Sequence, residues 1–164
     1  LMLFFTGIAR TAADVAKSYV TNISSKSRQL TRIYEMVDDA IEILSGSGSL
    51  DDFGYLLHET WMEKRSLSDQ VSNFYIDEIY DAAREAGALG GKLSGAGGGG
   101  MILLFVPPEK QEAVRTKLSS LILVPFRFEK TGSRIIFQAE HQRYEDSETW
   151  RSNSDTKFLD INDL

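Results

Sequence analysis

Residues 90–100 read GGKLSGAGGGG, and an apolar run, MILLFV, follows at once at residues 101–106. Seven of those first eleven residues are glycine. Glycine lacks a Cβ atom, tolerates positive φ and leaves its N–H group bare, so consecutive glycines can wrap a phosphate or pack closely against another loop. A flexible linker would not be expected to lead straight into an apolar strand. The stretch therefore predicts a close-packed loop that opens into a strand.

Two common phosphate-binding motifs do not explain this loop. Gly95, Gly97 and Gly100 satisfy the pattern GxGxxG, but the dinucleotide-binding fingerprint follows a strand and opens a helix. Here a helical pattern precedes the glycines and a strand follows them. The P-loop motif fails on its residues, because Ala86 and Leu93 occupy positions where it needs glycine and a Ser or Thr.

On either side of the loop, apolar spacing predicts a strand at residues 1–5 and a series of helices. The clearest helical stripe consists of Leu30, Ile33, Tyr34, Val37, Ile41 and Leu44. Asp51 and Asp52 are expected to supply the N-cap and first-turn charge of a third helix, and a fourth, at residues 74–86, is expected to end at Gly87. A helix carrying Val114, Leu118 and Leu121 and a hairpin of residues 124–128 and 135–137 follow. The order predicts an α+β fold, a four-stranded antiparallel sheet with helices on one face.

Composition indicates one folded domain at residues 1–140 and a polar, acidic, flexible tail at residues 141–164. The chain has 164 residues and a net charge of −6, which argues against a nucleic-acid surface. No apolar stretch is long enough for a membrane span and no export signal opens the chain, so a cytoplasmic location is expected. The absence of cysteine excludes disulfides and thiol chemistry.

The segment Lys92–Gly100, KLSGAGGGG, closely resembles the third sequence motif of the GHMP kinases, the superfamily that includes galactokinase, homoserine kinase and mevalonate kinase. Further stretches resemble the heptose 7-phosphate kinase branch; they are residues 3–10, 61–68, 76–80 and 124–128. Together they cover roughly residues 1–138. The resemblance implies the ferredoxin-like carboxyl half of such a kinase, with ATP and Mg²⁺ as cofactors and a sugar phosphate as substrate.

The amino-terminal half of these kinases carries the loop that wraps the ATP phosphates and the catalytic acid. No segment like Pro-x-x-x-Gly-Leu-Gly-Ser-Ser is recognisable here. The chain is therefore expected to be a carboxyl half that works with an absent amino-terminal half, where the catalytic residues would lie. Phosphoryl transfer depends on positioning and on cations that neutralise charge, so the chain alone should be nearly inactive. A homo-oligomer is left open.

By resemblance, Gly95, Ala96, Gly97 and Gly98 line the cleft beside the nucleotide phosphates. Lys92 either meets phosphate or caps the preceding helix. Two groups are candidates for the sugar phosphate, with salt bridges or solvated helix ends as the alternative readings; they are Thr6, Gly7 and Arg10 after the first strand, and Lys64 and Arg65 at a helix end. Trp61 is expected in the core, and Asp77 on a solvated helix face. No metal ligands are assigned.

Two functions from different classes remain. The favoured one is the carboxyl-terminal domain of an ATP-dependent kinase that phosphorylates the anomeric hydroxyl of a heptose 7-phosphate, with a fucose kinase or another GHMP sugar kinase as the alternative enzyme. The other is a non-catalytic ferredoxin-like binding or regulatory module. The sequence alone does not fix the sugar or the anomer.

Overall fold

The computed structural model describes residues 1–9, 12–20 and 23–137. The chain divides into two compact units, Leu1–Arg127 and Phe128–Leu164. The predicted boundary at residue 140 lies outside the described residues, so the division into a domain and a tail stays a prediction.

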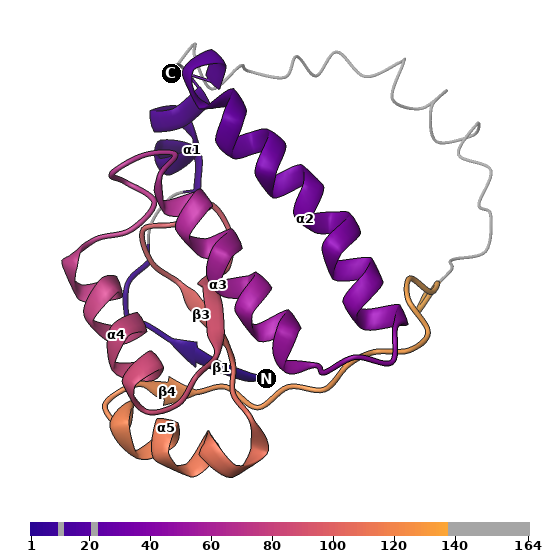
Figure 1. Ribbon diagram of the computed structural model, residues 1–164. Coiled ribbons are helices and arrows are strands. Elements are labelled where there is room, and N and C mark those ends of the chain that lie inside the picture. The colour runs from indigo at the N-terminus through magenta and orange to yellow at the C-terminus, as the bar shows by residue number, and fades with distance from the viewer. Residues whose placement is uncertain (10–11, 21–22, 138–164) are drawn as a thin grey trace, which may run out of the picture. The chain divides into compact units, whose positions relative to one another are not determined.

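The first unit is built on a four-stranded sheet with the strand order β2-β3-β1-β4. Its strands are β1 (Met2–Phe5), β2 (Gly90–Leu93), β3 (Met101–Phe105) and β4 (Ile122–Leu123). All three pairings are antiparallel, and β1 and β3 lie at the centre, where Phe4 faces Ile102 across the pair. Figure 1 shows β3 running beside β1. The predicted α+β class and four-stranded antiparallel sheet are confirmed.

Helices occupy the connections between the strands. They are α1 (Ala12–Val20), the 3₁₀ turn η1 (Ile23–Lys26), α2 (Ser27–Ser45), α3 (Asp51–Arg65), α4 (Phe74–Glu85), the 3₁₀ turn η2 (Pro108–Lys110) and α5 (Gln111–Lys117). The Asn73 side chain caps α4 by accepting a hydrogen bond from the Ile76 N–H at 3.1 Å. Gly87, with φ of 112°, ends that helix as predicted. No helix in the described ranges is long and apolar enough to cross a membrane.

The core lies between one face of the sheet and the helices. Phe4, Ile102 and Leu104 alternate with half-buried neighbours along their strands, so only one face of the central strands is fully covered. The helices contribute fully buried side chains to the same cluster; among them are Trp61, Ile76, Tyr80, Ala83 and Val114. The expected core position of Trp61 is confirmed, since the side chain is 0% exposed.

The predicted stripe on α2 is helical, but only its first two residues, Leu30 and Ile33, pack against the core. Met36 is buried, whereas Tyr34, Val37, Ile41 and Leu44 are 54–76% exposed. The α2 helix packs along α3, and the two run side by side in Figure 1. Arg32 reinforces this contact by donating two hydrogen bonds to Glu59 of α3. The apolar surface of α2 is therefore wider than α3 covers, and spacing alone did not identify the side that packs.

Two predicted elements are corrected by the structure. The hairpin of residues 124–128 and 135–137 is wrong, because no strand forms in residues 124–137. The fourth strand is instead β2, the first residues of the glycine stretch, which pairs with β3 from Gly90↔Phe105 to Leu93↔Ile102. The predicted cap of α3 by Asp51 is also wrong, since Leu50 is the N-cap residue and Asp51 lies in the first turn.

Candidate functional site

The glycine stretch turns from β2 into β3 as a loop of residues 94–100 that is pinned by hydrogen bonds to three separate segments. At its base, the Ser94 N–H donates to the Met101 carbonyl at 2.8 Å. Beyond that, the loop is held by the end of β1, by the segment between α3 and α4, and by the last turn of α3. The glycines are therefore part of a structured turn and not a linker.

The end of β1 holds the last glycine of the loop. The backbone N–H and the side-chain hydroxyl of Thr6 both donate to the Gly100 carbonyl at 2.9 Å. The Gly100 N–H in turn donates to the Ile8 carbonyl at 2.7 Å. Gly7 makes the turn between them at φ of 79°, with open space where a Cβ would lie. Thr6 is 1% exposed, so its hydroxyl is committed to the loop.

The segment between α3 and α4 holds the middle of the loop. The Gly98 N–H donates to the Val71 carbonyl at 2.8 Å, and the Asn73 side-chain amide donates to the Gly98 carbonyl at 3.3 Å. A Cβ on Gly97 would lie 2.6 Å from the Val71 carbonyl oxygen, and one on Gly99 would lie 2.8 Å from the Ile8 carbonyl oxygen. Both positions therefore require glycine for close backbone packing.

Several backbone donors of the loop have no partner among the residues that the structure describes. Among the described residues, no hydrogen bond is formed by the N–H groups of Gly95, Ala96, Gly97 and Gly99. Gly97 and Gly99 are buried, and a buried N–H without an acceptor is costly. Unpaired N–H groups gathered in a glycine-rich turn suit an anion such as a phosphate. The unpaired N–H groups of the loop are therefore compatible with the phosphate-binding role predicted from the sequence.

Two lysines lie beside the loop. Lys64, in the last turn of α3, donates to the Leu93 carbonyl at 3.3 Å and to the Gly95 carbonyl at 2.5 Å. Burial, with a smaller contribution from the nearby charge of Lys92, lowers the pKa of Lys64 to about 8. Lys92 is half-buried on β2 opposite Leu103. Its side chain makes no hydrogen bond to α4 among the described residues, so of its two alternatives helix capping has no support in the structure. Neither lysine side chain is fully exposed to solvent.

Arg65 makes an ion pair with Asp77 of α4, with 2.7 Å between the guanidinium nitrogen and the carboxylate. Ser72 donates to the other carboxylate oxygen of Asp77 at 2.6 Å. The expectation that Asp77 lies on a solvated face is therefore wrong. Arg10, the remaining candidate for a sugar phosphate, lies outside the described residues.

Sequence reasoning missed the residues behind the loop. Val71, which is 0% exposed, and Asn73 contact the loop through backbone and amide groups. Asn73 is recognisable from the sequence as a residue type that caps helices. Its contact with Gly98, 25 residues away along the chain, is not. Only the fold brings them together.

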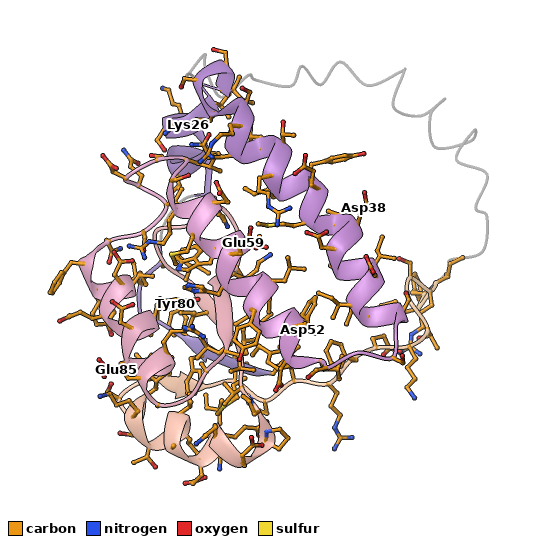
Figure 2. The ribbon with its side chains drawn as sticks, in the orientation of Figure 1. Lys26, Asp38, Asp52, Glu59, Tyr80 and Glu85 are labelled. Carbon is orange, nitrogen blue, oxygen red and sulfur yellow. The ribbon has the colours of Figure 1, made fainter. Side chains whose placement is uncertain are left out.

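His58 of α3 contacts Tyr80 of α4. The His58 ring stacks on Tyr80, which projects from α4 in Figure 2, and the His58 Nδ1 atom lies 2.7 Å from the Tyr80 hydroxyl. Burial lowers the pKa of His58 and raises that of Tyr80 to about 12. The pair links α3 to α4, and Tyr80 in turn packs against Trp61 in the core, with 6.1 Å between their ring centroids.

Acidic side chains do not gather at the loop in the described part of the chain. There, no group of three His, Cys, Asp or Glu side chains lies close enough to hold a metal ion. Among the described residues, the groups that would hold the phosphates of a nucleotide are therefore the unpaired N–H groups of the loop and Lys92.

The chain is similar to a known protein family and to individual curated proteins. The family described as GHMP kinases C terminal matches residues 40–122. The chain is 34% identical, over 113 residues, to D-glycero-alpha-D-manno-heptose 7-phosphate kinase from Campylobacter jejuni, covering 67% of this chain and 33% of that protein. It is 33% identical, over 119 residues, to L-fucokinase/L-fucose-1-P guanylyltransferase from Bacteroides fragilis, covering 71% of this chain and 12% of that protein.

A solved structure shares the fold. Mevalonate kinase from L. major, in complex with R-mevalonate, superimposes with a TM-score of 0.62 at 26% sequence identity, over 74% of this chain and 40% of that one. The chain thus spans a third or less of the length of these two curated relatives. With the family match over half of the sequence and the shared fold, the chain belongs to the GHMP kinase family and has the fold of its carboxyl-terminal domain.

Proposed function

We propose that this chain is the carboxyl-terminal part of an ATP-dependent kinase that phosphorylates the anomeric hydroxyl of a heptose 7-phosphate in the cytoplasm. The observation that carries the proposal is the glycine loop, whose unpaired N–H groups face no acceptor within the described residues. Residues Gly95 to Gly98 and Lys92 would lie beside the nucleotide phosphates. An amino-terminal half would supply the catalytic acid and the Mg²⁺ ligands; we call the two halves together the complete kinase.

The chemistry available to this chain is positioning and electrostatic stabilisation. When bound, ATP with Mg²⁺ supplies the phosphoryl group. Phosphoryl transfer spreads charge over phosphate oxygens, and fixed N–H dipoles near those oxygens lower the barrier without having to reorganise. The loop is suited to this because its attachments to Thr6, Val71 and Asn73 fix its backbone at Gly98 and Gly100.

The sugar acceptor is inferred from the similarity to heptose 7-phosphate kinase. The similarity to a fucokinase, at nearly the same identity, supports the alternative of another sugar. Gly7, Arg10 and Arg65 remain the proposed contacts to the substrate. Of these, Arg65 must exchange or share its ion pair with Asp77 in order to hold a phosphate. Thr6, the fourth candidate, would have to give up its hydrogen bond to the Gly100 carbonyl in order to reach the sugar.

A panel of acceptors tests the proposal. We expect the complete kinase to release ADP with a heptose 7-phosphate at least tenfold faster, in kcat/KM, than with the unphosphorylated heptose, fucose or mevalonate, because a charge-assisted phosphate contact contributes about 1.5 to 3 kcal/mol. The 164-residue chain alone should be inactive. In Arg65→Ala, only the reaction of the phosphorylated sugar should slow, by about tenfold or more.

Fucose or mevalonate as the best acceptor would replace the proposed substrate and leave the kinase assignment in place. An equal loss for both heptoses in Arg65→Ala would remove Arg65 from the phosphate site. Lys117→Ala is a suitable control, because Lys117 pairs with Glu85 near the end of α4, away from the glycine loop. If the complete kinase released no ADP with any of these acceptors, the kinase proposal would be refuted.

A further inference from the structure

Lys64 makes an unusual use of its ammonium group. It donates to two carbonyls, those of Leu93 and Gly95, which flank Ser94 at the start of the glycine loop. Burial of the side chain disfavours its charged form and lowers its pKa. Holding a flexible lysine in one conformation also costs side-chain entropy, up to about 2 kcal/mol. The two charge-assisted bonds must offset both costs for this conformation to persist.

The position of these carbonyls fixes the direction of two backbone N–H groups. A trans peptide unit is planar, so its N–H points opposite to its C=O. The Leu93 carbonyl points to Lys64, and the N–H of the same peptide, on Ser94, points away from it to the Met101 carbonyl. The Gly95 carbonyl also points to Lys64. The N–H of Ala96 is therefore directed away from Lys64, on the other side of the peptide.

The other hydrogen bonds that hold the loop do not restrain the Gly95–Ala96 peptide. The contacts from Val71 and Asn73 reach Gly98, and those from Thr6 and Ile8 reach Gly100. Gly95 has φ of 82°, and nothing lies within 4 Å of where its Cβ would be. Among the described residues, Lys64 supplies the hydrogen bond that orients the Gly95–Ala96 peptide.

We propose that Lys64 is a positioning residue that latches the glycine loop and aims the unpaired Ala96 N–H at the anion. The role deepens the proposed kinase function and rests on it. It differs from a direct contact with the sugar phosphate, because two of the three N–H donors of Lys64 are already used on the loop.

The first arm of the test measures the loop itself in the 164-residue chain. Lys64→Met keeps a long apolar stem and removes the donors, whereas Lys64→Arg keeps donors for carbonyl oxygens. We expect the ¹⁵N heteronuclear NOE of the Gly95 and Ala96 amides to fall in Lys64→Met, to stay near the parent value in Lys64→Arg, and to remain unchanged at Gly98 in both. Unchanged values at Gly95 and Ala96 in Lys64→Met would overturn the latch.

The second arm measures catalysis in the complete kinase. Loss of the latch should lower kcat/KM for ATP at least tenfold with heptose and heptose 7-phosphate alike, with recovery in Lys64→Arg. A loss confined to the phosphorylated sugar would overturn the latch and make Lys64 a substrate contact. Lys117→Met is the matched control, and Lys64→Leu, which also lacks a donor, replaces Lys64→Met if that variant does not fold. Because the first arm needs no enzymatic activity, it separates failure of the latch from failure of the proposed function.

Discussion

Replacing Gly97 with valine is expected to lower kcat/KM of the complete kinase at least tenfold, which corresponds to about 1.4 kcal/mol or more in the barrier. The residue has φ of 125°, where side chains are rarely tolerated, and its Cβ would lie 2.6 Å from the carbonyl oxygen and 2.8 Å from the Cα of Val71. Those are backbone atoms, so the loop must move away from them. Movement of the loop displaces the adjacent N–H groups of Ala96 and Gly98.

A control separates backbone strain from displacement of the loop. Gly132 also has positive φ, at 63°, but nothing lies within 4 Å of where its Cβ would be. Gly132→Ala should therefore leave kcat/KM within about twofold of the parent, since a surface change of this kind costs little. Unchanged kinetics in a folded Gly97→Val variant would exclude the loop from the active site.

Replacing Gly90 with alanine is expected to destabilise the chain by about 3 kcal/mol, near the upper end of the usual cost of overpacking. Its Cβ would lie 1.9 Å from the Gly54 carbonyl oxygen and 2.7 Å from the His58 backbone nitrogen. A helix backbone cannot yield as a flexible side chain does, so α3 must separate from β2. The free energy of unfolding in urea measures the loss.

Gly48→Ala provides the comparison for this variant, because the nearest atom to that Cβ would be a flexible carboxylate oxygen of Asp52 at 3.9 Å. It should change the free energy of unfolding by no more than about 0.5 kcal/mol. A loss of less than about 1 kcal/mol in Gly90→Ala would show that α3 does not approach β2 as closely as described.

The glycine stretch itself explains why the fold was only partly predictable. Its Gly90 and Gly91 lack the β-branched side chains typical of strands, so residues 90–93 were expected to be loop. They form β2 because glycine allows α3 to lie against the strand. Conversely, the alternation at residues 124–128 predicted a strand, but pairing with β1 ends at Leu123, apart from one bond from the Val124 N–H to the Leu3 carbonyl. Alternation does not reveal where a partner strand ends.

The candidate site divides in a similar way. The loop and its glycines were recognisable from the sequence, because their composition and the strand that follows are local features. The roles of Lys64 and Asn73 were not, since each depends on a contact with residues 25 or more positions away. The sequence left Lys64 either as a solvated residue or as a phosphate ligand. The structure shows a third arrangement, a hydrogen bond to the loop backbone, which depends on the packing of α3 against β2.

The central claim is that the unpaired N–H groups of the glycine loop meet the phosphates of a nucleotide. The most direct measurement is the ¹⁵N–¹H spectrum of the complete kinase, labelled in this chain, with and without a non-hydrolysable ATP analogue. We predict that the amide resonances of Gly95, Ala96, Gly97 and Gly99 shift on saturation, because a phosphate oxygen replaces solvent or an empty position as their acceptor, while that of Gly132 does not move. Saturable binding of the analogue with all four loop resonances unchanged would contradict the claim.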